Sequence, residues 1–296
     1  KILNKKVRSW KVSSIKIYNE KLDDNSSVEF NNETKELFNL VKYNELYNIF
    51  KNEISKNHYI KFKKKISNNS SLIINTDINS YISKKYFFKK IYKNYKSFAY
   101  TSIIEHKKIK NSVAYQIFTQ YGPLAYLPIT NNKTSIVYSY NGKKNINSYE
   151  IKKILNKYNT KYQITKIGNI QKFKINFSVL RNYFYKNILA FGDLLHKVHP
   201  LAGQGFNMTI RDIIILSDII NSKINLGLDI NASVASEFEK KLKHKNYLFS
   251  SGIDFIYEFF IFDNKVNNIL SKNIFRFLNN SNFFKKKSIF FADKGL

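Results

Sequence analysis

The sequence contains no cysteine among its 296 residues, only nine glycines and only three prolines. Without cysteine the chain forms neither disulfide bonds nor thiolate metal sites. Nothing in it indicates an oxidising compartment, so we expect a cytoplasmic protein. It also lacks a run of about 18 apolar residues, the length that a membrane-spanning helix requires; even the apolar stretch at 255–262 contains Glu258. The hydrophobic content of 43% is still sufficient to bury a sizeable core, which predicts a globular protein.

Acidic residues are also scarce: 21 aspartates and glutamates face 50 lysines and arginines, which gives a net charge of +29. Such an excess suits nucleic-acid binding, because each phosphate contact uses a cation. However, arginine, which reads bases through its bidentate fork, occurs only at four positions. The lysines are scattered among Asn, Ile, Tyr and Phe, residue types that share A/T-rich codons. We therefore attribute the charge to codon bias and predict no nucleic-acid partner.

The spacing of apolar residues separates extended from helical segments. Alternating or continuous apolar residues predict strands, and recurrence every three or four residues predicts helices. Strands are expected at 7–20, 28–32, 71–76, 98–140 (several strands) and 164–179, and helices at 43–56, 149–159, from 206, and through most of the region after 233. This order predicts an α/β fold that is interrupted by an antiparallel sheet and followed by a helical C-terminus.

Three of the nine glycines and one of the three prolines fall within residues 192–212, which read GDLLHKVHPLAGQGFNMTIRD. The preceding segment NILAF at 187–191 continues after Asn187 as an unbroken apolar run, as in a strand buried on both faces of a parallel sheet. Gly192 permits a tight turn. Asp193 then stands at the carboxyl end of a strand, where open α/β sheets bind ligands. A carboxylate in this position is suited to accept hydrogen bonds from sugar or ribityl hydroxyl groups.

A loop and a helix follow this turn. Pro200 fixes the backbone of the loop, and Gly203 and Gly205 allow another group to approach the main chain closely. From Phe206 onward the apolar residues recur at helical spacing. The free N–H groups and the positive dipole end of that helix favour negative charge at its start. Strand, turn, carboxylate, loop and helix together predict a site for a polar cofactor.

The stretch resembles the second FAD fingerprint of the class A flavoprotein monooxygenases, G-D-A-A-H-x-x-x-P-x-x-G-x-G-x-N. It is most similar to the GDAAHxxHPLAGQGLNLGxRD form of the ubiquinone-biosynthesis hydroxylases. The matching residues are Gly192, Asp193, His196, His199, Pro200, Leu201, Ala202, Gly203, Gln204, Gly205, Asn207, Arg211 and Asp212. Two further segments resemble the family in the same order, at 71–85 and 121–140.

The resemblance implies an incomplete Rossmann-like FAD-binding domain that is interrupted by an antiparallel β-sheet substrate domain. It assigns residues 1–35 and 91–180 to the substrate domain, 36–90 and 181–230 to the FAD-binding domain, and 231–296 to C-terminal helices. The family's first fingerprint, a G-x-G-x-x-G turn, is absent from the sequence. We therefore expect that about 50 to 70 N-terminal residues of a βαβ opening are missing. The alternative is that the protein does not hold FAD in the usual way.

The resemblance also implies roles for individual residues. Asp193 would hydrogen-bond the ribityl chain of FAD, and the helix that starts near Asn207 would stabilise negative charge on the reduced flavin. Asp77 is retained at the turn of the family's middle element, where neighbouring residues differ. The implied cofactor-binding residues are Asp193, Pro200, Gly203, Gln204, Gly205, Phe206, Asn207 and Asp77. No catalytic residue is singled out.

The implied activity is hydroxylation of an aromatic ring. NAD(P)H or another donor reduces the flavin, O2 adds to give a C4a-hydroperoxide, and the ring accepts one oxygen atom. For the ubiquinone subfamily the substrate would be a polyprenylated phenol, bound against the antiparallel sheet. Because such a substrate lies in a membrane, we expect peripheral contact with the inner membrane through the aromatic, basic C-terminal helices, and contact with other ubiquinone-biosynthesis enzymes.

Two alternatives stay open for the activity. One is a class A monooxygenase that acts on a soluble aromatic substrate. The other is a basic nucleic-acid- or membrane-binding protein without redox activity.

Several residues also have simpler interpretations. His196 and His199 have the spacing of a metal pair, but no third ligand is suitably placed, so we predict no metal site. Arg211 and Asp212 are adjacent and opposite in charge, which favours a pair on the helix surface. Asp77 alone is typical of a turn. Three polar residues in or beside strands could face a ring, without any being identified as a base: Glu105, His106 and Tyr126.

Overall fold

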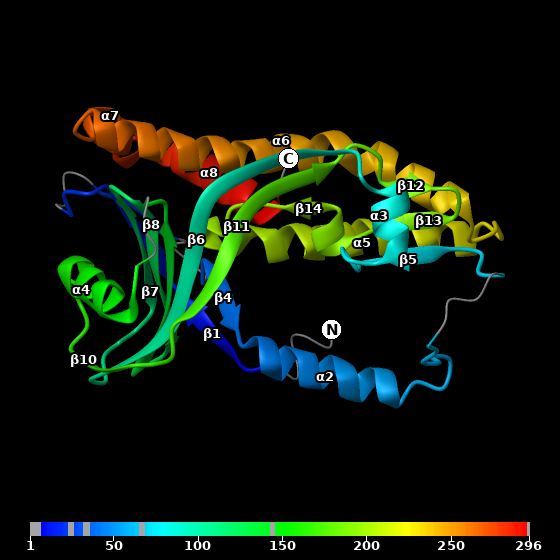
Figure 1. Ribbon diagram of the computed structural model, residues 1–296, viewed down its shortest axis with the longest axis horizontal. Coiled ribbons are helices and arrows are strands. Elements are labelled where there is room, and N and C mark those ends of the chain that lie inside the picture. Colours follow the sequence, from blue (N-terminus) through cyan, green and yellow to red (C-terminus); the bar gives the residue numbers. More distant parts are fainter. Residues whose placement is uncertain (1–6, 23–26, 32–35, 65–68, 143–145, 295–296) are drawn as a thin grey trace.

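The computed structural model of the protein describes residues 7–22, 27–31, 36–64, 69–142 and 146–294. Parts of the segment expected at 1–35 lie outside these residues. The described chain is built around one large sheet, with a small three-stranded sheet beside it and long helices across both (Figure 1). The predicted α/β fold with an antiparallel sheet and a helical C-terminus is confirmed.

The large sheet has nine strands within the described residues, and all but one of its pairings are antiparallel. Its order is β14-β11-β6-β9-β8-β7-β2-β3, and β10 pairs with the second half of β6. The strands are β2 (Ser14–Tyr18), β3 (Ser27–Asn31), β6 (Lys90–His106), β7 (Val113–Thr119), β8 (Gly122–Thr130), β9 (Lys133–Tyr140), β10 (Ile164–Ile167), β11 (Gln171–Leu180) and β14 (His196–Lys197). The parallel pair is β2 with β7.

The small sheet has the order β12-β13-β5, with β12 at Phe184–Tyr185, β13 at Ile188–Ala190 and β5 at Ile73–Asn75. Strands β13 and β5 run parallel, whereas β12 and β13 are antiparallel. Leu189 and Ala190 are fully buried, as the continuous apolar run predicts. Helix α3 (Tyr81–Tyr86) follows β5, and the Ser80 side chain caps its first turn.

Helix α6 (Ala232–Lys265) connects the two sheets because its buried stripe runs along its whole length. Near its start, Phe238 and Leu242 pack into the apolar cluster of the small sheet. Near its end, Tyr257 and Phe260 pack into a cluster of the large sheet. The rings of Phe118 and Phe260 stack with centroids 3.5 Å apart. The other helices of this layer are α5 (Gln204–Asn225), α7 (Ile269–Asn279) and α8 (Asn282–Lys294).

Helix α4 (Ser148–Tyr158) covers one face of the large sheet. It begins with a capping box, in which the side chains of Asn147 and Glu150 each accept a hydrogen bond from the other residue's backbone N–H. Its buried residues Ile151 and Leu155 pack against the tyrosines and aliphatic residues of β6 to β9. This cluster is a second core that lies on the far side of the sheet from α6.

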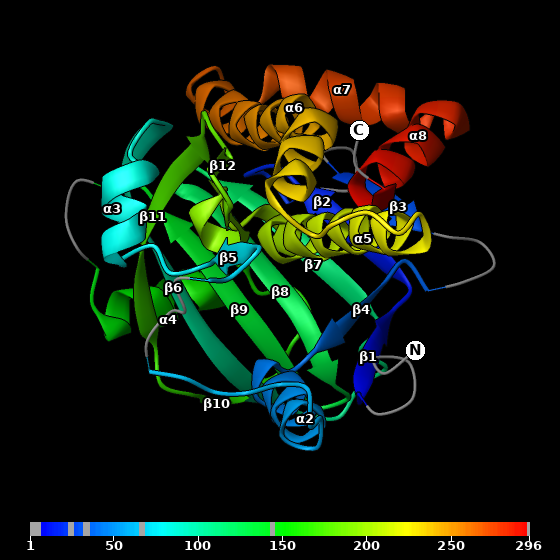
Figure 2. The ribbon, with the colours of Figure 1, turned by 90° about the vertical axis from the view of Figure 1, so that its right-hand side faces the viewer.

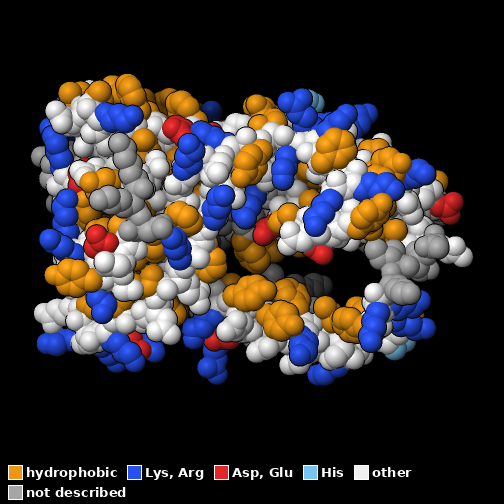
Figure 3. All heavy atoms as spheres, viewed as in Figure 1, with side chains coloured by type: hydrophobic (Ala, Val, Ile, Leu, Met, Phe, Trp, Pro, Cys, Tyr) orange, Lys and Arg blue, Asp and Glu red, His pale blue; other side chains and the backbone are white. Residues whose placement is uncertain are grey.

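The opposite face of the large sheet is only partly covered. Ala125 and Val137 are partners across β8 and β9, and Thr101 is the partner of Val137 on β6, so the three side chains share this face. Figure 2 looks onto it, with α5 above and α2 (Tyr43–Ser55) below. The space-filling view shows the molecule hollowed between α2 and the layer that contains α5 (Figure 3). A sheet face of small side chains, half-buried at Thr101 and Val137 and buried at Ala125, therefore borders this hollow.

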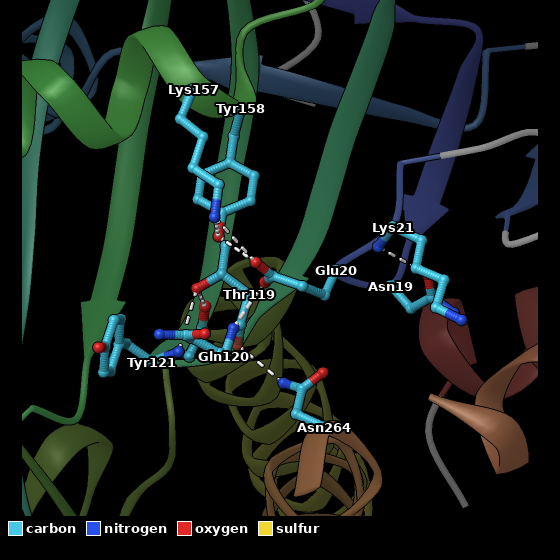
Figure 4. A network of polar contacts seen from close by, with 10 residues as sticks. Asn19, Glu20, Lys21, Thr119, Gln120, Tyr121, Lys157, Tyr158 and Asn264 are labelled. Atoms are coloured by element: carbon cyan, nitrogen blue, oxygen red, sulfur yellow. Dashed lines mark hydrogen bonds and ion pairs between the residues drawn. The ribbon is translucent and has the colours of Figure 1, made fainter. Parts of the chain in front are cut away.

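A polar network lies at one corner of the large sheet, around Glu20, which follows β2 (Figure 4). One carboxylate oxygen of Glu20 accepts hydrogen bonds from the Tyr158 hydroxyl and from Lys157 Nζ, the latter at 3.2 Å. The other accepts the backbone N–H of Gln120 at 2.7 Å. Burial, reinforced by Glu20, raises the pKa of Tyr158. The network joins β2, the β7–β8 turn and the end of α4.

Three expectations need correction in detail. The segment 7–20 is two strands, because β1 (Ser9–Val12) pairs with β4 (Phe38–Val41) while β2 joins the large sheet. The segment 164–179 is likewise divided into β10 and β11. Strand β13 has a parallel neighbour on one side only. The predicted helices at 43–56 and 149–159 are confirmed as α2 and α4. The domain boundaries stay a prediction.

Candidate flavin site

The strand-to-turn junction forms as the sequence predicts. Gly192 follows β13 with φ of +63°, a conformation that favours glycine, and a Cβ at this position would meet no atom within 4 Å. A 3-10 turn, η2 (Gly192–Leu194), follows. It leaves Asp193 exposed while Leu194 and Leu195 are buried. The Asp193 carboxylate therefore lies in solvent at the carboxyl end of β13.

Asp77 lies beyond the carboxyl end of β5, the parallel neighbour of β13. Because Asn75 and Ala190 are partners in register, Asp77 and Asp193 leave the small sheet at the same edge. Asp77 is exposed, and its Oδ1 accepts the backbone N–H of Asn79 at 2.8 Å. The carboxylate thus stabilises its own turn, as the simpler interpretation expects.

The loop before α5 presents its backbone to the outside. A second 3-10 turn, η3 (Leu201–Gly203), follows the exposed Pro200. Gly203 is the N-cap of α5 with φ of +66°, and a Cβ there would also meet no atom within 4 Å. No side chain caps this helix start. The loop is therefore open at the residues that the sequence assigns to cofactor binding.

The first turn of α5 offers unused polar groups. The amides of Gly205 and Phe206 precede the first hydrogen bond of an α-helix and so have no partner inside it. Phe206 is 53% exposed and Asn207 is exposed. The carboxamide oxygen of Gln204 is buried and has no hydrogen-bond partner among the described residues. These groups are available to a ligand that lies against the helix start.

Two motif residues are tied together beneath the loop. His196 Nε2 on β14 lies 2.6 Å from Asp212 Oδ2 on α5, and both side chains are buried. Asn246 Nδ2 on α6 donates to Asp212 Oδ1 at 3.1 Å. The predicted surface pair of Arg211 with Asp212 is therefore wrong, because Asp212 points into the core. The Arg211 guanidinium instead lies over the ring of Phe249.

His199 is also buried, and neither ring nitrogen has a hydrogen-bond partner within the described chain. Burial lowers its pKa to about 3, so the ring is neutral at ordinary pH. Within the described residues no cluster of three or more His, Cys, Asp or Glu side chains is arranged to hold a metal ion. The His196 ring contacts Asp212, and the His199 ring stacks on aromatic rings.

The three polar residues of the sheet do not converge on this loop. Tyr126 belongs to the α4 face, where its hydroxyl donates to the Leu155 carbonyl. His106 is buried against Thr134 and the Lys107 carbonyl. Glu105 pairs with Lys133, and this cation lowers the pKa of the carboxyl. None of them is placed to act on a ring beside the helix start.

The arrangement fits a flavin on observations of the chain itself. Two glycines with positive φ leave open space, an exposed carboxylate directly follows the first of them, and free amides and a buried orphan oxygen line the helix start. A planar polar ring that carries a hydroxylated side chain needs such a mixture of main-chain donors, a carboxylate acceptor and close backbone approach. Sequence reasoning located the loop but missed the His196–Asp212–Asn246 contact, since Asn246 lies outside the motif.

Part of the chain is similar to known FAD-binding proteins. Residues 96–225 match the family model of an FAD binding domain. Ubiquinone hydroxylase UbiL of Rhodospirillum rubrum is 24% identical over 153 residues, 49% of this chain and 36% of that protein. The 3-demethoxyubiquinol 3-hydroxylase of Escherichia coli is 28% identical over 152 residues, 48% of this chain and 38% of that protein. The chain thus spans less than half the length of these curated relatives.

Solved structures share the fold. The p-nitrophenol 4-monooxygenase PnpA of Pseudomonas putida superposes with a TM-score of 0.74 at 9% identity, covering 97% of this chain and 82% of that one. Klebsiella pneumoniae HpxO, solved with FAD and uric acid, gives 0.72 at 10% identity, covering 99% and 83%. Together, the fold, the glycine loop and the matched sequences make this chain similar to the FAD-dependent monooxygenases, with ubiquinone-biosynthesis hydroxylases among its relatives.

Proposed function

We propose that the protein is an FAD-dependent monooxygenase that hydroxylates a polyprenylated phenol in ubiquinone biosynthesis. The observation that carries the proposal is the open loop from Pro200 to Asn207, together with the exposed Asp193 on a turn that contacts α5. The relatives whose names state ubiquinone hydroxylation support the substrate class. NAD(P)H is proposed as the electron donor.

Each residue of the loop receives a role that follows from its chemistry. Asp193 would accept hydrogen bonds from the ribityl hydroxyls, and Pro200 with Gly203 would line the ring system. The amides of Gly205 and Phe206 would donate to the flavin, and the N-terminal end of α5 would favour negative charge on it. Gln204 and Asn207 would supply side-chain amides. Asp77, held in its turn, contributes to the same edge of the site.

FAD supplies the activation of O2 that the chain's own side chains lack. In the overall reaction one oxygen atom enters the ring and the other leaves as water, with two electrons and one proton from NAD(P)H and a second proton from solvent. The substrate ring would lie in the hollow between the loop and the partly covered sheet face that carries Thr101, Ala125 and Val137. The small side chains of this face would help to exclude water from the ring.

The test is isotope incorporation. The protein is incubated with FAD, NAD(P)H, a short-chain prenylated phenol and 18O2, and the product is analysed by mass spectrometry. We expect one 18O atom in the ring product, and its loss in Asp193→Ala. The matched control is Asp218→Ala, which removes an exposed carboxylate farther along α5. Wild-type protein that binds FAD yet transfers no 18O to any phenol would contradict the proposal.

Peripheral membrane contact is the second part of the proposal. None of the described helices is long and apolar enough to cross a bilayer. However, α6 to α8 expose many large apolar side chains, and Figure 3 shows such side chains gathered over α7. They include Phe255, Ile256, Phe262, Ile269, Leu270, Ile274, Phe277, Phe283, Phe284, Phe290 and Phe291. Residues 266–292 also carry five cations and no acidic residue. An aromatic, basic surface of this kind suits an anionic membrane such as the cytoplasmic side of an inner membrane, where other ubiquinone-biosynthesis enzymes would be met.

Vesicle flotation tests this surface. The protein should float with vesicles that contain anionic lipid, and less so as the salt concentration rises. The double variant Phe255→Ser/Phe262→Ser should remain at the bottom of the gradient. The control, Tyr59→Ser/Phe62→Ser, removes two aromatic rings that are even more exposed but lie outside these helices. Equal flotation of the two double variants would rule the surface out.

A further inference from the structure

The bond between His196 and Asp212 spans the proposed flavin loop. His196 lies on β14 just before the loop, and Asp212 lies in the third turn of α5 just after it, 16 residues away. The segment between them contains Pro200, Gly203 and the free amides of the helix start. The bond therefore joins the two ends of the segment that is proposed to hold the cofactor.

The contact is buried, and both carboxylate oxygens of Asp212 have a hydrogen-bond partner. The side chains of His196 and Asp212 are 1% and 0% exposed. One oxygen of Asp212 faces His196 Nε2, and the other accepts from Asn246 on α6. Because a carboxylate accepts hydrogen bonds, Nε2 of His196 carries the proton. The contact thus unites β14, α5 and α6 at one buried point.

Other parts of α5 are held by different contacts. Leu216 and Ile219, on its next turns, pack into the apolar cluster of the small sheet. The first turn lacks a side-chain cap, and Phe206 is exposed. Val198, Leu201 and Met208 also anchor the loop and the first turns of α5 in the large-sheet cluster. Loss of the His196–Asp212 bond should therefore loosen this segment rather than unfold it, while the C-terminal half of the helix keeps its packing.

From this geometry we infer that His196 is a positioning residue. Its bond to Asp212 holds the backbone from 197 to 211 in the pose that presents the amides of Gly205 and Phe206, before any cofactor binds. The inference rests on the proposed function for the identity of the ligand. The pose of the loop is a property of the chain alone and is tested separately.

Hydrogen exchange of the protein without cofactor tests the pose. In His196→Ala, the hydrogen-bonded amides within 201–211 should exchange about tenfold faster or more, because a buried hydrogen bond to a charged group is lost. Amides at 216–225 should change little. His196→Gln, which can still donate an N–H to Asp212, should restore slow exchange in the loop. If His196→Ala does not fold, Asp212→Asn, which keeps the side-chain shape, takes its place. His106→Ala is the control, since it removes an equally buried histidine from the large sheet.

Titration with flavin mononucleotide, followed by flavin fluorescence, then tests the link to the cofactor. We expect His196→Ala to weaken binding about tenfold or more, and His196→Gln to recover most of it. Unchanged loop exchange in His196→Ala, or exchange that rises evenly over the whole chain, would overturn the positioning role. Faster loop exchange with unchanged flavin affinity would overturn its link to the cofactor. Wild-type protein that binds no flavin would instead contradict the proposed function, leaving the exchange data to decide the pose.

Discussion

His199 and Tyr257 stack face to face beneath the proposed flavin loop, with ring centroids 4.1 Å apart and an interplanar angle of 24°. Tyr95 approaches the same imidazole edge-on at 5.5 Å. His199 thus serves as an aromatic core residue between the large sheet and α6, although it belongs to the motif that suggested a ligand site. Its environment stabilises the neutral ring, because a charged imidazole would lose its hydration there without gaining a partner.

This burial predicts acid-sensitive stability. The pKa of His199 in the folded protein is about 3, whereas a histidine in an unfolded chain has a pKa near 6.5. Between pH 6.5 and pH 3 the unfolded state therefore binds a proton that the folded state does not bind. The contribution of His199 is complete above pH 6.5 and is lost progressively as the pH falls toward 3. Between pH 7.5 and 4.5 it amounts to about 2 to 3 kcal/mol.

The variant His199→Phe should remove this part of the pH dependence. Urea unfolding at pH 7.5 and 4.5 measures it as the difference between two free energies of unfolding. His58→Phe, at an exposed histidine, is the control and should leave that difference as in the wild type. A His199→Phe protein that loses as much stability in acid as the wild type would show that His199 is not buried as a neutral ring.

The two loop glycines should respond oppositely to alanine. Gly203 has φ of +66° and open space around a Cβ, so alanine there costs about 1 kcal/mol of backbone strain without a clash. Gly205 lies inside α5, and its Cβ would make an ordinary 3.6 Å contact with Val198. Alanine at Gly205 should therefore leave the free energy of unfolding unchanged or raise it by up to about 1 kcal/mol. Chemical denaturation measures both; the reverse order of stability would refute the described helix start.

Two buried tyrosines of the core between α4 and the large sheet differ in whether their hydroxyl is hydrogen-bonded. The Tyr126 hydroxyl donates to the Leu155 carbonyl at 3.0 Å, whereas the Tyr138 hydroxyl has no hydrogen-bond partner in the described part of the chain. Tyr126→Phe should lower the free energy of unfolding by about 1 kcal/mol, because a buried carbonyl loses its donor. Tyr138→Phe should cost nothing or stabilise. Equal losses in the two variants would mean that the contact between β8 and α4 is not as described.

The sequence predicts the local elements well where one physical signal dominates. The apolar run at 188–191 and the helical spacing of apolar residues at 149–159 each indicate their element directly, and β13 and α4 form there. The break at Ser13 was not predictable, since alternation continues across it and only long-range pairing sends β1 and β2 to different sheets.

The site shows the same division. The special backbone conformation at Gly192 and Gly203 was predictable, because both have a positive φ, which few other residues tolerate. The partners of Asp212 were not predictable, because the adjacent Arg211 carries the opposite charge and is nearer along the chain. Only the packing of α5 on β14 and α6 turns the Asp212 carboxylate inward, toward His196 and Asn246. Local chemistry can be read along the chain, whereas contacts between distant elements depend on the assembled core.

The central claim is that Asp193 and the following loop hold a flavin. Its most direct test is titration of the full chain with FAD, followed by the shift of the flavin's visible absorbance, in the wild type, Asp193→Ala and Asp218→Ala. We predict saturable binding by the wild type and Asp218→Ala, and at least about tenfold weaker binding by Asp193→Ala at unchanged unfolding midpoint. An Asp193→Ala protein with full cofactor occupancy and wild-type affinity would contradict the account.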